Sequence, residues 1–251
     1  MTVDVLILAG APNKGALKKI TPEEHEALIK IKDMPMVEYV IKAVNRATHT
    51  GKVVVVGPRE QLEEYVNEKI DLIVDSGDSL VENIQKGFEV LDTSNLVLLM
   101  TSDIPLITED VIDEFILSCN NEEADIYYPI IPKEKNKAKY PNVKRTYVHL
   151  VEGTFTGGNM VLIKPTVLQN SIDLLRKAVL WRKKPWKLSQ ILGMKFIFKF
   201  LMGNLSIEEI QERVKEITGY KGVGMITEHP EIGFDVDKPS DLKLMRDKYI
   251  L

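Results

Sequence analysis

The first hundred residues alternate short apolar runs with segments whose apolar residues recur at helical spacing. The apolar runs, typical of buried strands, are residues 3–9, 52–56, 72–74 and 96–100. The helical segments between them are residues 36–47, 61–69 and 79–91. This order predicts an α/β fold built on a doubly wound, mostly parallel sheet with right-handed crossovers.

The second half of the chain has a different pattern. Further strands are expected at residues 124–131, 146–151, 160–163 and 222–226, with a charged loop at 133–139 and a glycine turn at 154–159. Helices are expected at residues 168–179, 206–217 and 239–248, and the second opens with a capping box of Ser206 and Glu209. The predicted domains are a core of residues 1–165 and 222–251 and a helical insert of residues 166–221 near the C-terminus.

Composition narrows the class of protein. The 251 residues are 44% hydrophobic and 28% charged, as in ordinary globular domains, and the net charge of −4 does not favour nucleic-acid binding. No segment has the roughly 20 apolar residues of a membrane span, and the N-terminus lacks the basic region of a signal peptide. The lone Cys119 has no intrachain disulfide partner. We therefore expect a cytoplasmic protein without a nucleic-acid partner.

Asp103 is the most informative candidate for chemistry. It follows the apolar run 96–100, at the carboxyl edge of the expected sheet, where open α/β sheets bind ligands. Capping of the next helix would also explain an acid, but Thr108 already suits that cap. A carboxylate at this edge favours Mg²⁺ (or Mn²⁺), because such hard ions bind few carboxylates together with water and phosphate oxygens.

Two other segments offer complementary groups. The loop of residues 8–15 is rich in small residues and carries Lys14, so its backbone can approach and bind a phosphate. It is neither a dinucleotide fingerprint nor a Walker A motif. Near the C-terminus, Asp235 and Asp237 precede Pro239, and one of them could complete a metal site with Asp103. Helix capping by Asp237 or Ser240 is the alternative.

A glycine pair lies between two expected strands. Gly157, Gly158 and Asn159 can form a turn whose backbone faces a ligand. A turn without a ligand explains the same residues equally well.

Four short motifs, in chain order, resemble the nucleotidyltransferases with a MobA-like or GT-A-type fold. They are residues 8–11 with Lys14, 26–36, 103–106 and 237–242. The corresponding family patterns are L-A-G-G, K-x-L-l-x-i-x-x-k-P-m, D-x-P-l and D-T-P-e-D-L. The resemblance covers about residues 3–165 and 222–248, and it implies a Rossmann-like, GT-A-type nucleotidyltransferase fold.

The resemblance implies a metal-dependent enzyme that transfers an NMP group from an NTP and releases pyrophosphate. The acceptor would be a small phosphorylated molecule, such as a sugar phosphate, an alditol phosphate or a molybdopterin-like compound. Asp103 with Asp237 or Asp235 would hold Mg²⁺ (or Mn²⁺), and Gly157, Gly158 and Asn159 would contact the acceptor. The catalytic residues would be Lys14, Lys30 and Asp103, and the nucleotide-binding residues Leu8, Ala9, Gly10, Ala11, Asn13, Lys14, Ser79 and Asn83.

Two positions depart from the family pattern. Gly15, next to Lys14, stands where the family usually has an arginine, and Glu26 stands where it has a lysine. A carboxylate would repel phosphate, so Lys14, Lys18 or Lys30 would have to replace that lysine. Two alternatives stay open: a GT-A-type glycosyltransferase that uses a nucleotide sugar, although Asp103 lacks paired D-x-D spacing, and a non-catalytic nucleotide-binding module, which Glu26 favours.

The expected insert contains an unusual stretch. Residues 181–187 are basic and flanked by tryptophans, and residues 188–202 are very apolar, with Lys195 and Lys199 on one helical face. One interpretation is a helix packed against the domain or against a dimer partner. The other is a peripheral helix on a membrane surface, for which basic residues, Trp and a bulky apolar face are typical. If this second interpretation holds, the acceptor could be a lipid-linked or alditol phosphate.

Overall fold

The computed structural model describes residues 1–91, 95–121, 123–181 and 184–249. Within them, nine strands form one sheet and two form a small hairpin. The sheet strands are β1 (Val3–Leu8), β4 (Thr50–Gly57), β5 (Leu72–Asp75), β6 (Val97–Thr101), β7 (Ile126–Pro132), β8 (Val148–Leu150), β9 (Gly153–Gly157), β10 (Met160–Ile163) and β11 (Gly222–Ile226), and the hairpin is β2 (Lys30–Ile31) and β3 (Met34–Pro35). The helices are α1 (Met36–Arg46), α2 (Arg59–Tyr65), α3 (Leu80–Glu89), α4 (Glu109–Ser118), α5 (Lys133–Lys139), α6 (Pro165–Trp181), α7 (Pro185–Leu192), α8 (Met194–Leu201), α9 (Ile207–Thr218) and α10 (Pro239–Leu244).

The strands of the large sheet follow the order β5-β4-β1-β6-β10-β7-β9-β8, with β11 beside β7. β1 pairs in parallel with β4 and β6, and β4 with β5. β10 is antiparallel to both β6 and β7, and β9 is antiparallel to β7 and β8, so β9 and β10 run against the other strands. This mixed, mostly parallel sheet with flanking helices confirms the predicted fold class.

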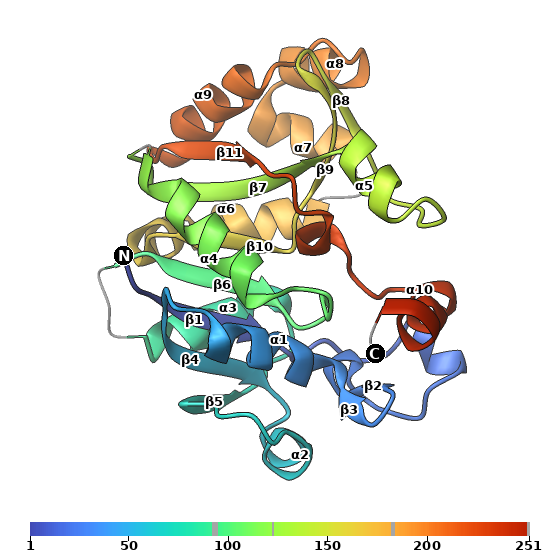
Figure 1. The fold of residues 1–251 in the computed structure, drawn as a ribbon. Helices are drawn as coiled ribbons and strands as arrows, with labels where there is room; N and C mark the ends of the chain where they lie inside the picture. The colour runs from blue at the N-terminus through green and yellow to red at the C-terminus, as the bar shows by residue number, and fades with distance from the viewer. Residues whose placement is uncertain (92–94, 122, 182–183, 250–251) are drawn as a thin grey trace.

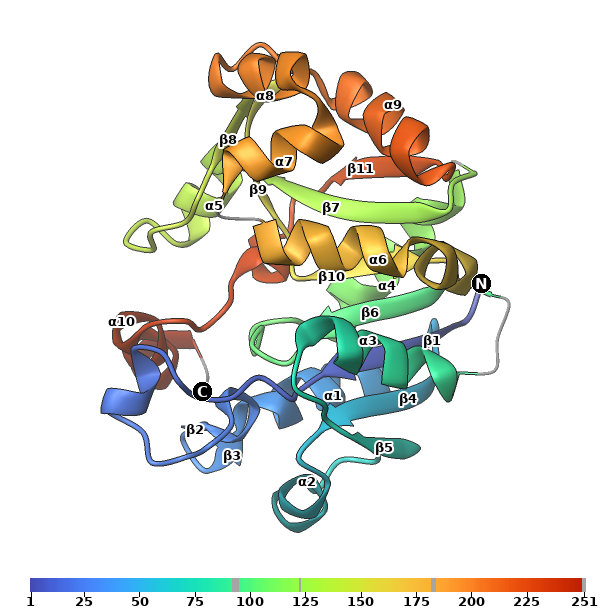
Figure 2. The same ribbon diagram turned by 180° about the vertical axis from the view of Figure 1, so that it is seen from behind.

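Helices cover both faces of the sheet. α1 and α4 lie on one face (Figure 1), and α3 and α6 lie on the other (Figure 2). β1 serves both layers, since Val5 and Ile7 belong to the core on the α1 and α4 side while Leu6 and Leu8 belong to the core under α3 and α6. Such burial on both faces explains why its sequence is a continuous apolar run rather than an alternating one.

The order of the strands creates a switch point beside β1. The chain passes from β1 to β4 and β5 on one side, and then returns to β6 on the other side. The carboxyl ends of β1 and β6 therefore lie side by side, with Leu8 paired to Thr101. In doubly wound sheets the crevice at this point is where ligands bind.

The structure differs from the sequence-based expectations at four places. Residues 133–139, predicted as a loop, form α5, because Lys, Glu and Ala favour helix and the buried Asn136 bonds the Tyr147 hydroxyl at 3.1 Å. The predicted turn at residues 154–159 mostly forms β9, paired between β7 and β8. The helix predicted at residues 61–69 corresponds to α2, which ends at Tyr65, so residues 66–69 lie outside it. Gly193, with a φ of 88°, divides the apolar stretch into α7 and α8.

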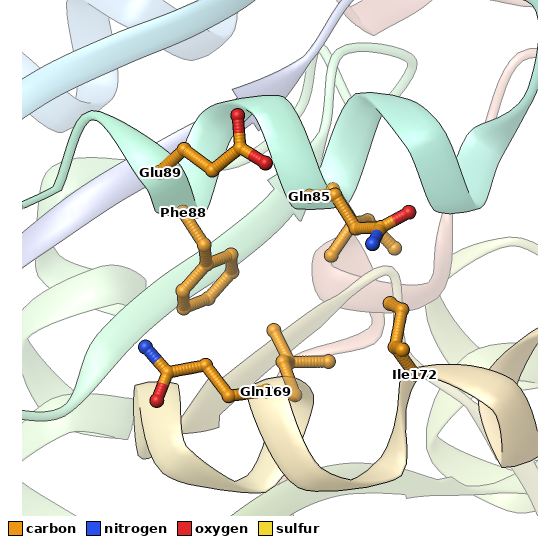
Figure 3. A pocket seen from close by; sticks show the side chains of 7 residues that line it. Gln85, Phe88, Glu89, Gln169 and Ile172 are labelled. Carbon is orange, nitrogen blue, oxygen red and sulfur yellow. The ribbon is translucent and has the colours of Figure 1, made fainter.

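The segment predicted as an insert consists mainly of α6 to α9. α6 packs on α3, and a hollow of about 130 Å³ between them is lined by Gln85, Phe88, Gln169 and Ile172 among others (Figure 3). This hollow shares no lining residue with the cavity at the switch point described below. Residues 182 and 183 of the predicted basic break lie outside the described residues.

In the part of the chain that the structure describes, no helix combines the length and the apolar character needed to cross a membrane.

The central position of β1 predicts a large effect of mutation at Leu6. Its side chain is fully buried, and a Cβ on Gly87 of α3 would come within 2.3 Å of it, so α3 sits directly against this side chain. We expect Leu6→Ala to lower the free energy of unfolding by about 2–5 kcal/mol in urea titrations. Leu117→Ala, at a 46% exposed position on α4, should change it by about 0.5 kcal/mol or less. Equal losses of unfolding free energy in the two variants would contradict the central packing of Leu6.

Candidate active site

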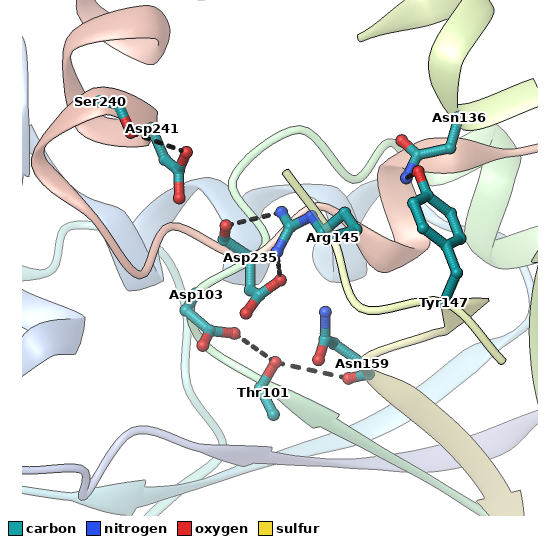
Figure 4. Close-up of polar contacts among 9 residues, drawn as sticks. All are labelled: Thr101, Asp103, Asn136, Arg145, Tyr147, Asn159, Asp235, Ser240 and Asp241. Atoms are coloured by element: carbon teal, nitrogen blue, oxygen red, sulfur yellow. Dashed lines mark hydrogen bonds and ion pairs between the residues drawn. The ribbon is translucent and has the colours of Figure 1, made fainter. Parts of the chain in front are cut away.

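Three carboxylates from distant parts of the chain meet at the switch point. Asp103 follows β6, and Asp235 and Asp237 precede α10. One carboxylate oxygen of each lies within 4.8 Å of the other two, as a shared metal ion would require. Figure 4 shows Asp103 and Asp235 on adjacent segments of chain. The structure thus brings together the three acids that the sequence suggested.

Local packing explains this convergence. The Val236 N–H donates to the Asp103 carbonyl at 2.9 Å, which ties the C-terminal segment to the end of β6. Phe234 and Val236 are fully buried in a cluster with residues such as Leu17 and Tyr140, whose ring meets that of Phe234 edge-on at 4.6 Å. Because Phe234 and Val236 turn inward along this extended segment, Asp235 and Asp237 are presented on the outside.

Thr101, the last residue of β6, holds the side chain of Asp103 in place. The Thr101 hydroxyl donates to its carboxylate at 2.5 Å (Figure 4). Burial raises the pKa of Asp103, and the nearby charge of Asp237 adds to that rise, while the bond from Thr101 opposes it. An acid whose negative charge is disfavoured in this way is stabilised by a cation at the same place.

Asp235 differs from the other two acids because it already has a positive partner. Arg145 forms an ion pair with its carboxylate, and Nη2 of Arg145 donates to its carbonyl at 2.7 Å (Figure 4). The guanidinium also lies 4.9 Å from the centre of the Phe234 ring. Sequence reasoning missed Arg145, since it lies between α5 and β8 in a segment without a motif, 90 positions from Asp235.

The oxygen donors suit a hard divalent cation. Among the described residues, neither a hydrogen bond nor an ion pair reaches the Asp237 carboxylate, which is exposed, and Thr101 occupies one oxygen of Asp103. Asp103 and Asp237 therefore offer free oxygens, whereas Asp235 is bound by Arg145. Two carboxylates with open space around them match the way Mg²⁺ binds next to a phosphate-bearing substrate.

A cavity of about 510 Å³ opens beside Asp103, between the loop after β1 and the start of α3. The loop contributes Gly10, Ala11, Pro12 and Lys14, and β1 contributes Leu8. Gly10 is required by close packing, since a Cβ there would lie 2.6 Å from the Ser76 Cβ and 2.7 Å from Nδ2 of Asn83. The loop backbone thus runs against the wall of the cavity, as predicted.

Two polar residues at the start of α3 face the same cavity. Ser79 is the N-cap of α3 and accepts the Glu82 N–H at 3.2 Å. The Asn83 side-chain oxygen accepts the Gly77 N–H at 2.6 Å, so its amide NH₂ remains available toward Gly10. Both line the cavity, although their bonds show that they also shape the loop of residues 75–79.

Three residues predicted for this site lie elsewhere. Ala9 is fully buried behind the cavity. The Asn13 amide is used inside the loop, where it donates to Thr21 Oγ1 and to the Glu23 carbonyl, both at 2.9 Å. Lys30 lines a separate hollow that includes Pro22 and Tyr65. These three have no contact with the cavity beside Asp103.

The residues predicted to bind the acceptor lie on the other side of Asp103. The Asn159 carbonyl accepts the Thr101 N–H at 3.0 Å, so Asn159 lies beside the end of β6 (Figure 4). Gly157 and Gly158 pack against neighbours: the Tyr128 hydroxyl donates to the Gly158 carbonyl at 3.0 Å and would lie 2.2 Å from a Cβ on Gly157. Gly157 therefore makes room for Tyr128, and Gly158 makes room for Ile232 and Pro129.

Glu26 adds another carboxyl to the cavity wall, which also includes Asp78 and Asp103. Burial raises its pKa from 4.5 to about 7, and the charges of Asp103 and Asp237 add to that rise. His25, its neighbour, also lines the cavity. Near neutral pH this carboxyl keeps its proton part of the time, which weakens the repulsion of phosphate expected from a glutamate at this position.

The raised pKa of Glu26 predicts a pH-dependent stability. Between pH 4.5 and about 7 the folded state binds more protons at this group than the unfolded state, so its contribution to stability falls as pH rises. Glu26→Gln removes the ionisation. In chelator-containing buffer, we expect a higher melting temperature than wild type at pH 8 and no gain at pH 4.5. A gain of equal size at both pH values would contradict this explanation.

Comparison with known proteins shows the family and the fold of this chain. The MobA-like NTP transferase domain matches residues 6–186. A hypothetical transferase from Thermus thermophilus is 34% identical, with a TM-score of 0.84, and the alignment covers 96% of this chain and 100% of that one. No curated protein sequence matches this chain significantly.

Two more distant structures share the fold. One is CMP:2-keto-3-deoxy-manno-octonic acid synthetase complexed with CTP, with 12% identity, a TM-score of 0.61, and 98% of this chain and 97% of that one covered. The other is 2-C-methyl-D-erythritol 4-phosphate cytidylyltransferase from Thermus thermophilus, with 14% identity, a TM-score of 0.56 and full coverage of both chains, 100% each. The domain match over residues 6–186 shows that this chain belongs to the MobA-like NTP transferase family, a nucleotidyltransferase family.

Proposed function

We propose that this protein transfers an NMP group from an NTP to a small phosphorylated acceptor and releases pyrophosphate. The acceptor would be a sugar phosphate, an alditol phosphate or a molybdopterin-like compound. The observation that carries the proposal is the meeting of Asp103, Asp235 and Asp237 within 4.8 Å of one another, at the edge of a cavity whose other wall is the Gly10 loop. Nucleotidyl transfer depends on positioning the reactants and on stabilising charge. The acids would bind a cation for this purpose, and the loop would bind the phosphates.

The NTP would occupy the cavity beside Asp103. Its volume of about 510 Å³ lies in the usual range of about 300–1,000 Å³ for small-molecule sites. Backbone N–H groups of Gly10 and Ala11 would bind the phosphates, and Lys14 would neutralise part of their charge. Ser79 and Asn83, at the opposite wall, would contact the nucleoside.

Asp103 and Asp237 would hold Mg²⁺ or Mn²⁺, and Arg145 would keep Asp235 in position beside them. When bound, the ion neutralises the triphosphate and the charge that develops on the leaving pyrophosphate. An oxygen of the acceptor attacks the α-phosphorus as the bond to the β-phosphate oxygen breaks, and Lys14 stabilises the pyrophosphate. Asn159, on the Arg145 side, would orient the acceptor.

We also propose that residues 1–165 and 222–251 carry the reaction and that residues 166–221 do not take part in it. All residues that line the cavity lie between Leu8 and Asp103. The remaining acids, Asp235 and Asp237, come from the C-terminal part of the core.

Substitution of Asp103 tests the proposal. Asp103→Asn keeps the size of the side chain and removes the charge, so pyrophosphate release should fall by about 100-fold or more, with an unchanged circular dichroism spectrum. The assay screens the four NTPs against sugar phosphates, alditol phosphates and molybdopterin. Asp173→Asn, at an 84% exposed position, serves as the matched control and should keep full activity.

The same assay separates the alternatives. A GT-A-type glycosyltransferase would consume a nucleotide sugar without forming pyrophosphate, and a binding module would retain NTP without product. Wild-type turnover that persists in Asp103→Asn would remove this residue from the reaction.

Metal binding is tested separately from turnover. Since Asp237 offers free oxygens and Asp235 is occupied by Arg145, Asp237→Asn should weaken Mn²⁺ binding by roughly tenfold or more in calorimetric titrations. Asp173→Asn should bind Mn²⁺ as the wild type does. An unaltered affinity in Asp237→Asn would exclude this residue as a ligand.

A further inference from the structure

A large apolar surface lies at one end of the molecule, on α7 and α8. Both helices stand at the end of the sheet opposite β5 and α2 in Figures 1 and 2. No residue of α8 is buried. Large apolar side chains are strongly exposed here, with Met194 at 73% and Trp186 at 70%, and Phe198, Leu201 and Met202 join them. We call these five residues the apolar face.

The apolar face has the spacing of one side of a helix. Met194, Phe198 and Leu201 follow each other at i, i+4 and i+7, so they share one side of α8. The other side packs toward α9, where Lys199 forms an ion pair with Glu209. Arg213 of α9 also donates to the Ile191 carbonyl at 2.8 Å. Contacts with α9 therefore anchor α7 and α8 and leave the apolar face outward.

The charge of this region is opposite to that of the rest of the protein. The 34 residues 174–207 contain eight lysines and arginines and no acid, a charge of +8 in a chain whose total is −4, which leaves −12 for the remainder. Lys184 and Lys195 are exposed, and each lies within two positions of Trp186 or Met194. Basic groups thus border the apolar face.

The positive charge beside the apolar face favours one of two possible partners, a second copy of this chain or an anionic bilayer. A second copy docked symmetrically would bring the exposed Lys184 and Lys195 of both copies together, and their repulsion would oppose association. A bilayer with anionic lipids attracts the lysines and receives apolar side chains at the boundary between headgroups and acyl chains. A tryptophan beside lysines is typical of that boundary.

We propose that α7 and α8 form a membrane-surface anchor that binds anionic phospholipids. The apolar face enters the headgroup boundary, and Lys184 and Lys195 contact lipid phosphates. The anchor shares no residue with the cavity beside Asp103, so its test is independent of the proposed reaction. It is a peripheral contact of two short helices of eight residues each that lie on the surface.

Co-sedimentation of the full chain with lipid vesicles tests the anchor. Wild type should bind vesicles of phosphatidylcholine with about 30% phosphatidylglycerol, bind pure phosphatidylcholine about tenfold more weakly, and lose affinity with rising salt. The double variant Phe198→Glu with Leu201→Glu should lose about tenfold or more of the binding to anionic vesicles. Lys184→Glu with Lys195→Glu should reduce binding to the anionic vesicles specifically.

A matched control places the same two charges elsewhere. Tyr65→Glu with Leu117→Glu changes two exposed apolar residues outside α7 and α8 and should bind as wild type does. Wild type that stays in the supernatant with anionic vesicles would overturn the proposal, as would full binding by the Phe198 and Leu201 variant. A dimer in light scattering that dissociates in this variant, without vesicle binding, would also overturn it and assign the face to a second copy.

Discussion

The hydrogen bond between the Val236 N–H and the Asp103 carbonyl, 2.9 Å long, joins two segments that are far apart in the chain. It acts together with the burial of Phe234 and Val236, each of which stabilises the arrangement by about 1.5–3 kcal/mol. These contributions oppose the repulsion between Asp103 and Asp237, which is reflected in the raised pKa of Asp103. Hydrophobic packing therefore holds the acids together before any cation binds.

The charges around this junction are distributed unequally. Arg145 neutralises Asp235, and Lys14 lies across the cavity in the β1 loop. Among the described residues, Asp103 and Asp237 form no ion pair with a cationic side chain, and Glu26 adds to the same negative field.

Part of the opposite charge lies on α7 and α8, outside the lining of the cavity: Lys187, Lys195 and Lys199. The chain concentrates +8 in residues 174–207 while the rest carries −12. α7 and α8 lie at the end of the sheet formed by β7, β8 and β11 (Figure 2). A membrane anchor at that end leaves the acids beside Asp103 free for a nucleotide.

The order of apolar runs and helical segments determined the α/β class, because burial on both faces of a parallel sheet requires such runs. Short motifs also pointed to Asp103 and the Gly10 loop, which follow strand ends, and to Asp237, which precedes a helix, because such places depend on nearby sequence. Helix α5 was missed, since a run of lysines suits a loop as well as a helix when the burial of Asn136 is unknown.

Tertiary structure alone decided which polar groups meet. Asn13 lies in the predicted phosphate loop and Lys30 was expected to replace the family lysine absent at Glu26, yet one bonds within its own loop and the other lies at a separate hollow. Arg145 lacks a motif and still reaches Asp235, because the packing of Phe234 and Tyr140 brings their segments together. Periodicity and turn chemistry are local properties that a sequence displays, whereas the partner of a charged side chain depends on long-range packing.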